Sequence, residues 1–312
     1  MFREINNPLQ SAMKMLFKFS SLLFATLIST TGCAEQGPQT TDHSPPVQLE
    51  YFGRVQGDIQ YYGLNSSVET WTDFDDDGKP TRLGITISES FVDRNSETLS
   101  AKLDDDQRQM NTGSYFDLEL PEHPGIPFRH AYFSFHPMGH VPPGIYNMPH
   151  FDFHFYLVPS GARKAMAPEA VGRAMEPVAD GYLPASYRAA AKYNNFYWPY
   201  MGTHFVSDHT DEIKITEGGD IEPGGERFDQ TFIYGTFGGE VVFFEPMVSS
   251  WFLETIKEAD RGGQAFDVEL PVRFKRAGYY PTKYRIAYAN DPMTGLGYYT
   301  VSIEDLVWKE AS

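Results

Sequence analysis

The chain is short of cysteine, of basic residues and of long apolar runs, and each shortage excludes a class of protein. Cys33 is the only cysteine among 312 residues, so the chain can form no internal disulfide and no thiolate metal site. Only 25 basic residues stand against 42 acidic ones, a formal charge of −17, which argues against nucleic acid as a partner. Neither a glycine-rich phosphate loop nor a Gly-x-Ser-x-Gly motif is present, which disfavours nucleotide-dependent and serine-hydrolase chemistry.

An apolar run near the N-terminus ends at Cys33. Lys14 and Lys18 precede LFATLIST at 23–30, which is too short to span a bilayer permanently and is typical of an export signal. The run closes with L-I-S-T-T-G-C, which resembles the bacterial lipobox, whose cysteine is acylated and becomes the first mature residue. We therefore expect residues 1–32 to be a lipoprotein signal peptide and Cys33 to be the lipidation site. The alternative is an ordinary secretory signal with an incidental cysteine.

Residues 33–48 are expected to tether a folded domain to the membrane. Most of this stretch, AEQGPQTTDHSPPVQ, is polar and proline-rich, which is typical of a flexible linker. Ala34 follows the cysteine where an aspartate would favour retention at the inner membrane, so by resemblance to other lipoproteins we expect an outer-membrane anchor facing the periplasm. No fixed-period repeat and no internal linker interrupts 49–312, which predicts a single β-rich domain.

Short strand patterns separated by turn residues predict a mainly β domain, either an antiparallel β-sandwich or a barrel-like fold. DDDGKP at 75–80 predicts a hairpin; it also resembles the start of an EF-hand loop, but Gly84 stands where calcium needs a glutamate. A second hairpin is expected at 232–246. Alanine-rich segments predict a small helical insertion at 162–193, and amphipathic spacing predicts one helix at 247–259. The buried side of that helix is expected to carry Met247, Trp251, Phe252 and Ile256.

Histidine is concentrated in one part of the chain. Four of the nine histidines fall within the nineteen residues from His136 to His154. The segment PHFDFHFYLV at 149–158 alternates between apolar and polar residues, and successive side chains of a strand point to opposite faces. The phenylalanines are therefore expected to pack into a core. The opposite face should present His150, Asp152, His154 and Tyr156.

Clustered imidazoles beside a carboxylate are typical of a transition-metal site, here for Zn, Cu, Fe or Ni. His140 follows in a turn rich in proline and glycine, while His204 and Glu245 lie in two further segments that could complete the site. The candidate metal ligands are His136, His140, His150, Asp152, His154, His204 and Glu245. An uncharged, hydrogen-bonded histidine cluster and a solvated sheet face are the alternatives. His123 and His130 are expected to be structural or exposed.

Four motifs in this region resemble a known family. They are H-P-M-G-H-x-P, P-H-F-D-F-H-F-Y, M-G-x-H-x-x-x-D and Y-G-x-x-x-G-x-V-x-F-x-E-P-M, and the similarity runs from about residue 50 to 305. The family comprises bacterial exported proteins of unknown function and is represented by a Thermus protein under sigma-E/anti-sigma-E control. The resemblance implies a β-rich fold, a homo-oligomer and a single constellation formed by the seven candidate ligands. It implies no reaction.

Two functions remain open at this level. The first is an exported lipoprotein with a histidine-rich metal site, which could be a metal-dependent hydrolase or an oxygenase-like enzyme with Tyr156 or Glu245 as acid or base. The second is a non-enzymatic envelope module that binds a small molecule or assists assembly through an aromatic and histidine pocket. A cupin-like enzyme ranks below both, because the glycine spacing and the following glutamate of cupins are missing.

Overall fold

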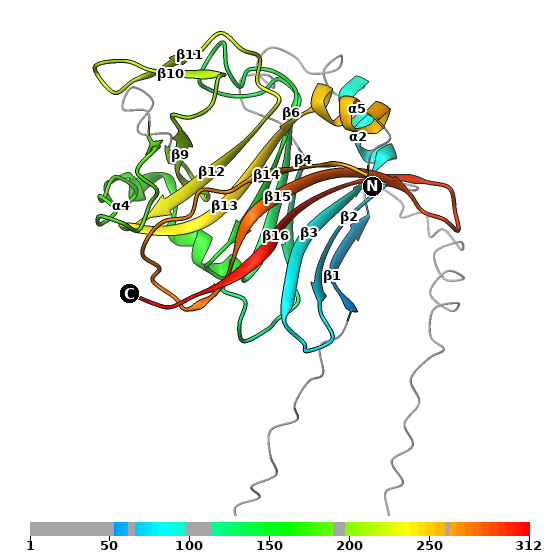
Figure 1. The fold of residues 1–312 in the computed structure, drawn as a ribbon. Coiled ribbons are helices and arrows are strands. Elements are labelled where there is room, and N and C mark those ends of the chain that lie inside the picture. The colour runs from blue at the N-terminus through cyan, green and yellow to red at the C-terminus, as the bar shows by residue number, and fades with distance from the viewer. Residues whose placement is uncertain (1–52, 62–65, 98–113, 190–196, 260–261) are drawn as a thin grey trace, which may run out of the picture. The chain divides into compact units, whose positions relative to one another are not determined.

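The computed structural model describes residues 53–61, 66–97, 114–189, 197–259 and 262–312. Within these residues the protein is mainly β and its strands pair antiparallel in two large sheets, which confirms the predicted fold class (Figure 1). The expected signal peptide, Cys33 and the tether lie outside the described residues. No helix in the described part of the chain has the length and apolar character needed to cross a membrane.

The first large sheet has six strands in the order β1-β2-β3-β16-β15-β14. Its strands are β1 (Gly53–Tyr61), β2 (Ser67–Phe74), β3 (Pro80–Ser88), β14 (Gln264–Asp267), β15 (Gly278–Asn290) and β16 (Gly297–Lys309). The predicted hairpin at 75–80 joins β2 to β3. Within it, Asp75 Oδ1 accepts hydrogen bonds from the main-chain N–H groups of Asp77 at 3.1 Å and Lys79 at 2.8 Å, so this carboxylate stabilises the turn.

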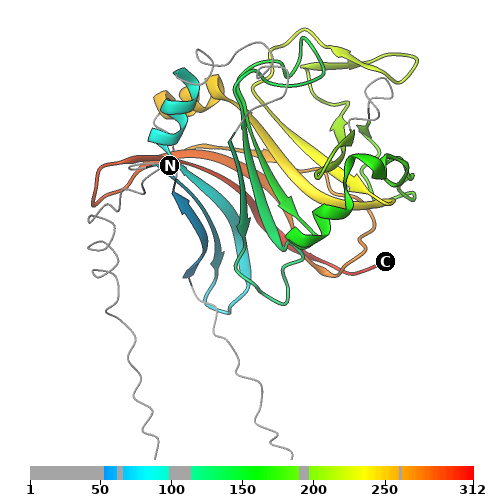
Figure 2. The same cartoon turned by 180° about the vertical axis from the view of Figure 1, so that it is seen from behind.

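The second sheet follows the order β4-β5-β6-β13-β12-β9-β7, with β8 paired to β9 at its side. Its strands are β4 (Ser114–Glu119), β5 (His130–His136), β6 (His150–Tyr156), β7 (Tyr187–Arg188), β8 (Tyr197–Trp198), β9 (Gly202–Ser207), β12 (Gln230–Phe237) and β13 (Glu240–Ser249). The second predicted hairpin joins β12 to β13 through Gly238 and Gly239. The histidine-bearing strand β6 lies between β5 and β13, in the interior of this sheet (Figure 2).

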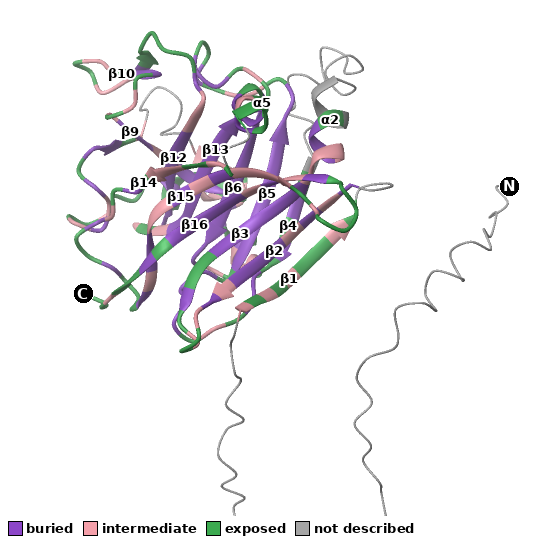
Figure 3. Cartoon of the chain, turned by 45° about the vertical axis from the view of Figure 1, so that its right-hand side comes forward, coloured by how far each residue is buried: buried purple, intermediate pink, exposed green. Residues whose placement is uncertain are grey.

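The two sheets pack face to face and enclose an aromatic core. Phe151, Phe153 and Phe155 of β6 are fully buried there, as their alternation predicts. From the facing sheet, Ile85 of β3 and Val301 of β16 are fully buried in the same core. Figure 3 shows β3 of the first sheet and β5, β6 and β13 of the second as buried along most of their length. The fold is therefore a β-sandwich.

A second apolar cluster covers the opposite, outer face of the larger sheet. Tyr156, Phe243 and Met247 contribute from the sheet, and the covering segments contribute Tyr146 and Phe228, all of them buried. These segments include η1 (Ser160–Ala165), η2 (Pro168–Ala170), α4 (Val171–Ala174) and the hairpin of β10 (Ile213–Ile215) with β11 (Ile221–Pro223). Both faces of β6 are consequently buried.

The predicted helical segments are shorter in the structure than in the sequence pattern. The insertion at 162–193 holds two 3-10 turns and the four-residue α4, and Tyr187–Arg188 form strand β7 where a helix was expected. Residues 190–193 lie outside the described part. Prolines at the first position of η2 and through the segment limit helix length, because proline lacks the N–H needed inside a helix.

Helix α5 (Ser250–Ala259) lies at the end of the β12–β13 hairpin, and α2 (Glu89–Glu97) follows β3. The expectation for 247–259 was correct in type, but Met247 belongs to β13 and is buried there rather than in the helix. Phe252 and Ile256 are buried as predicted. The expectation for Trp251 was wrong: this side chain is 40% exposed, and its indole N–H donates to Asp229 Oδ1 at 2.6 Å.

Candidate functional site: two histidine and carboxylate groups

The polar face of β6 is not in contact with solvent. His150 and His154 are fully buried and Asp152 is 2% exposed, because the second apolar cluster and its covering segments close over them. A solvated sheet face is therefore excluded as the explanation of the histidines. Burying an imidazole or a carboxylate costs free energy unless each polar atom finds a partner, so the partners of these groups decide what the site can do.

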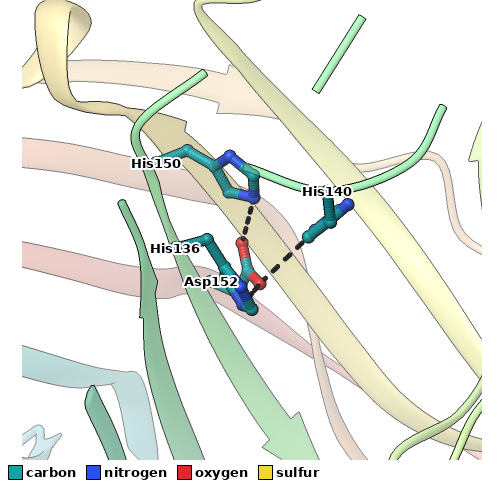
Figure 4. A group of neighbouring side chains, drawn as sticks. All are labelled: His136, His140, His150 and Asp152. Atoms are coloured by element: carbon teal, nitrogen blue, oxygen red, sulfur yellow. Dashed lines mark ion pairs between the residues drawn. The ribbon is translucent and has the colours of Figure 1, made fainter. Parts of the chain in front are cut away.

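Four of the predicted ligands converge on one point. His136 ends β5, His150 and Asp152 lie on β6, and His140 lies on the loop between these strands (Figure 4). The carboxylate of Asp152 is the centre: His136 Nε2 lies 2.7 Å and His140 Nε2 3.8 Å from its Oδ2, and His150 Nε2 lies 3.3 Å from its Oδ1. One possible ligand atom from each residue lies within 4.8 Å of the other three. We call these residues the four-residue group.

The position of His140 depends on the turn that precedes it. Gly139 adopts a left-handed φ of +67°, and a Cβ atom there would lie 2.0 Å from the main-chain oxygen of Tyr146. Only glycine satisfies both conditions. The N–H of His140 then donates to that same oxygen at 3.0 Å, which holds the loop against the sheet. The glycine and proline content of PMGHVPPG therefore has a structural consequence, which is the placement of one imidazole.

The main chain sets the orientation of two rings in this group. His150 Nδ1 lies 2.7 Å from the carbonyl oxygen of Met148, and His140 Nδ1 lies 2.8 Å from that of Val141. Because a carbonyl oxygen only accepts, each Nδ1 carries the proton and each neutral ring leaves a lone pair on Nε2. Such carbonyl contacts are the usual way in which metal-binding histidines are held.

His150 Nε2 and Asp152 Oδ1 therefore face each other as two acceptors at 3.3 Å. Neither atom has a hydrogen-bond partner, although both are buried. Burial lowers the pKa of His150 to about 3, so no proton bridges the two atoms at neutral pH. A cation between them would relieve this contact.

Asp152 is ionised in this environment. Burial by itself would raise its pKa, but the interaction with His136, whose Nε2 lies 2.7 Å from Oδ2, outweighs that effect and holds the pKa well below its usual range. Ser134 Oγ also lies 3.4 Å from Asp152 Oδ2 and donates to it. The group thus combines one charged carboxylate with three imidazole rings, a donor set that suits a divalent transition-metal ion.

The remaining three candidate ligands form a separate group. His154 of β6, His204 of β9 and Glu245 of β13 bring one ligand atom each to within 4.8 Å of the others. The Nε2 atoms of His154 and His204 lie 3.3 Å from Oε1 and 3.5 Å from Oε2 of Glu245. The strand register explains the meeting, because Met247 pairs with Asp152 and Glu245 therefore comes beside His154, two residues further along β6. We call these residues the three-residue group.

Burial dominates the electrostatics of the three-residue group. Glu245 is 1% exposed and His154 fully buried. Burial, together with the charge of Asp152, raises the pKa of Glu245 well above its usual range, whereas burial lowers the pKa of His154 well below its own. Both groups thus favour the neutral form. In charge, the second group therefore matches the uncharged cluster considered from the sequence.

The ring of Phe243 packs against both histidines of the three-residue group and holds their positions. The ring centroid of Phe243 lies 4.8 Å from that of His154 and 5.0 Å from that of His204. A Cβ atom on Gly235 of the neighbouring strand would lie 1.9 Å from Cε1 of this ring. Glycine at 235 therefore makes the space that Phe243 fills, and Phe243 in turn positions both imidazoles.

A small cavity joins the two groups. It has a volume of about 30 Å³ and is lined by His136, His140, Asp152 and His204, with Trp198 and Met201 among the apolar lining residues. This volume suffices for one or two water molecules. The rings of Trp198 and His140 lie 5.8 Å apart, and the side chain of His140 is 18% exposed. The site therefore has space for a ligand that the protein does not itself supply.

Sequence reasoning did not single out two residues that support this region. Trp198 lines the cavity that joins the two groups. Arg163 is buried with its guanidinium 3.9 Å above the ring of Tyr132, and it pairs with Asp117 and donates to the carbonyl oxygen of Tyr200 at 2.8 Å. A buried arginine in an alanine-rich segment carries no local signal that reveals such a role.

His130 and His123 lie outside both groups, as expected. His130 is fully buried, and its ring stacks on Tyr156 with the centroids 4.6 Å apart. His123 packs against Phe74 at a ring-centroid distance of 5.2 Å.

Comparison of the chain with protein-family models, with curated proteins and with solved structures finds no match. The family resemblance in the histidine motifs accordingly stays a prediction.

Proposed function

We propose that this protein is a lipid-anchored protein of the cell envelope that binds a first-row transition-metal ion at the four-residue group. The observation that carries the proposal is the unbridged contact of 3.3 Å between His150 Nε2 and Asp152 Oδ1. Two buried acceptors at this distance repel each other, and a metal ion between them converts the repulsion into two coordinate bonds.

The donor set restricts the identity of the ion. Imidazole nitrogens with a single carboxylate suit Zn, Cu, Fe or Ni, whereas Ca and Mg prefer sites made of oxygen ligands. His140, His150 and Asp152 are the direct ligands. His136, whose Nε2 already lies 2.7 Å from Asp152 Oδ2, either joins them or keeps the carboxylate oriented.

Because a cavity adjoins the four-residue group, the site favours an ion with one coordination position open to water or another small ligand over an ion coordinated by protein atoms alone. His136, His140 and Asp152 line this cavity, so a water molecule in it would lie beside the ion. A bound transition-metal ion supplies a Lewis acid that lowers the pKa of such a water. The residues of the chain hold the ion, and Trp198 and Met201 restrict the cavity to small ligands.

The proposed location rests on the lipobox-like L-I-S-T-T-G-C segment and the tether that follows it. Expression in a bacterium that processes lipoproteins should place the protein in the membrane fraction, with an acylated Cys33 at its N-terminus in mass spectra. Cys33→Ser should release the protein from the membrane. A membrane-free wild-type protein with an unmodified Cys33 would show that the segment is an ordinary secretory signal.

The metal proposal is tested by the metal content of untagged protein purified without chelator. Plasma mass spectrometry should find at least one Zn, Cu, Fe or Ni ion per chain after equilibration with the metal. His140→Ala is the informative variant, because this ring is partly exposed on a loop and its removal disturbs the core little. His209→Ala is the matched control, since the side chain of His209 is 73% exposed and lies outside both groups.

We expect His140→Ala to weaken binding by at least tenfold and His209→Ala to leave it unchanged. Failure of folded wild-type protein to take up any of the four metals would contradict the proposal. Equal losses in His140→Ala and His209→Ala would also contradict it, because binding would then be non-specific. The histidine pocket would in either case be better described by the alternative, an envelope module that binds a small molecule.

A further inference from the structure

The three-residue group shares the structural signature that identifies the first site. His154 Nδ1 lies 3.2 Å from the carbonyl oxygen of Tyr132, so the proton is on Nδ1 and the lone pair on Nε2 points to Glu245. Neither His154 Nε2 nor Glu245 Oε2 has a hydrogen-bond partner, and both atoms are buried. Two interior strands hold these two residues, and His204 completes the group from β9.

The spacing of a β-strand separates the two groups. Alternate residues on one face of a strand lie about 6.6 Å apart, so His150 and His154 are about 13 Å apart at their Cα atoms and cannot share one ion. Asp152 and His154 are nearest neighbours on that face. Ions held by the two groups would therefore lie roughly 5–8 Å apart, which is longer than the roughly 3.5–4 Å of a tightly bridged pair.

The cavity lies where two such ions would face each other. His136, His140 and Asp152 line it from the first group and His204 lines it from the second. Each group buries one carboxylate, so two divalent ions would leave an excess of positive charge around the cavity. A hydroxide ion or another small anion is the ligand that best compensates this charge.

We propose that the three-residue group binds a second divalent transition-metal ion, so that the protein carries a two-metal centre whose ions flank one shared small-ligand cavity. The inference rests on the proposed function, because it requires an ion at the four-residue group. The second site is the weaker of the two, since it offers three protein ligands. Water or hydroxide in the cavity completes its coordination.

Copper(II) is the probe that tests both number and distance. Untagged protein is titrated with Cu²⁺, bound ions are counted by native mass spectrometry, and electron paramagnetic resonance detects dipolar coupling between them. His204→Ala removes the partly exposed ligand of the second group, and Glu245→Gln replaces the buried carboxylate by an isosteric amide. His209→Ala again serves as the exposed control.

We expect two copper ions per wild-type chain with a dipolar-coupled signal. His204→Ala and Glu245→Gln should each retain one ion and lose the coupling, while His209→Ala should behave as wild type. The proposal of a second site would be overturned if the wild type bound only one ion, and if His204→Ala kept that ion while His140→Ala lost it or bound it more weakly. The first site would then stand, and the three-residue group would be an uncharged hydrogen-bonded cluster. Two ions without coupling would also overturn it. Absence of any ion would remove both proposals.

Discussion

His130 is a buried neutral histidine outside both groups, and it makes the stability of the protein sensitive to acid. Its ring is fully buried, and its Nδ1 lies 2.8 Å from the carbonyl oxygen of Val158. Burial lowers its pKa to about 4, from the ordinary histidine value of 6.5. Between pH 6.5 and pH 4 the His130 ring is protonated in the unfolded chain and neutral in the folded protein, so the free energy of unfolding falls as the pH is lowered.

The size of the effect follows from the two pKa values. From pH 7.5 to pH 5.0, this single group should remove about 2 kcal/mol of unfolding free energy, at about 1.4 kcal/mol per pKa unit. His130→Gln keeps a donor for the Val158 carbonyl and cannot titrate. We therefore expect the wild type to lose about 2 kcal/mol more than His130→Gln over this interval, whatever the other groups contribute to both proteins.

Urea unfolding at the two pH values, followed by circular dichroism, measures the difference between the two losses. A chelator keeps the protein metal-free, and the comparison is repeated with saturating metal. The four-residue group does not include His130, so metal should leave the His130 contribution unchanged. Equal losses in wild type and His130→Gln would refute the argument, because they would show that the folded protein accepts the proton near the normal pKa.

Two glycine substitutions test how the groups are positioned. Gly139→Ala introduces a Cβ 2.0 Å from the Tyr146 oxygen and strains a φ of +67°, so it should displace His140 and weaken metal binding at least tenfold by titration, with an unchanged circular dichroism spectrum. Wild-type affinity would contradict this. Gly235→Ala forces the ring of Phe243 aside, so urea unfolding should show a loss of about 1–3 kcal/mol. Gly235→Ala should also abolish copper binding at the three-residue group and leave copper binding at the four-residue group unchanged. Loss of copper from the four-residue group alone would contradict the assignment of Phe243 to the three-residue group.

Local patterns were sufficient to predict the strands and their inner face. The alternation in residues 149–158 places Phe151, Phe153 and Phe155 in the core, and the structure agrees. Alternation could not reveal that the opposite face is buried too, because the covering residues, such as Tyr146 and Phe228, come from loops before and far beyond this strand. The same limitation allowed a solvated face to remain among the alternatives.

The grouping of the ligands depends on register, which local sequence does not determine. The pairing of Met247 with Asp152 places Glu245 beside His154. Gly235 pairs with both His204 and Phe243, so His204 lies only two residues along β13 from Glu245. The seven candidates are all brought into these two groups. Their division follows from strand geometry, since about 13 Å separates His150 from His154 along one strand.

Helix prediction failed where composition and tertiary contacts disagree. The alanine-rich insertion favours helix by propensity, yet short 3-10 turns form, because prolines interrupt it and Arg163 is drawn into buried contacts with Tyr132 and the Tyr200 carbonyl. Trp251 shows the same effect in α5. Its position on the expected buried side is overridden by the hydrogen bond to Asp229 and by the cation–π contact with Arg227 at 3.7 Å.

Anomalous diffraction from crystals grown with Zn²⁺ tests the central claim most directly. Data collected on both sides of the zinc absorption edge should give a peak bounded by His140 Nε2, His150 Nε2 and the Asp152 carboxylate, at about 2.0–2.2 Å from each ligand atom. Such a peak would establish the four-residue group as a metal site. Fully occupied zinc elsewhere, with no anomalous density beside Asp152, would contradict the account.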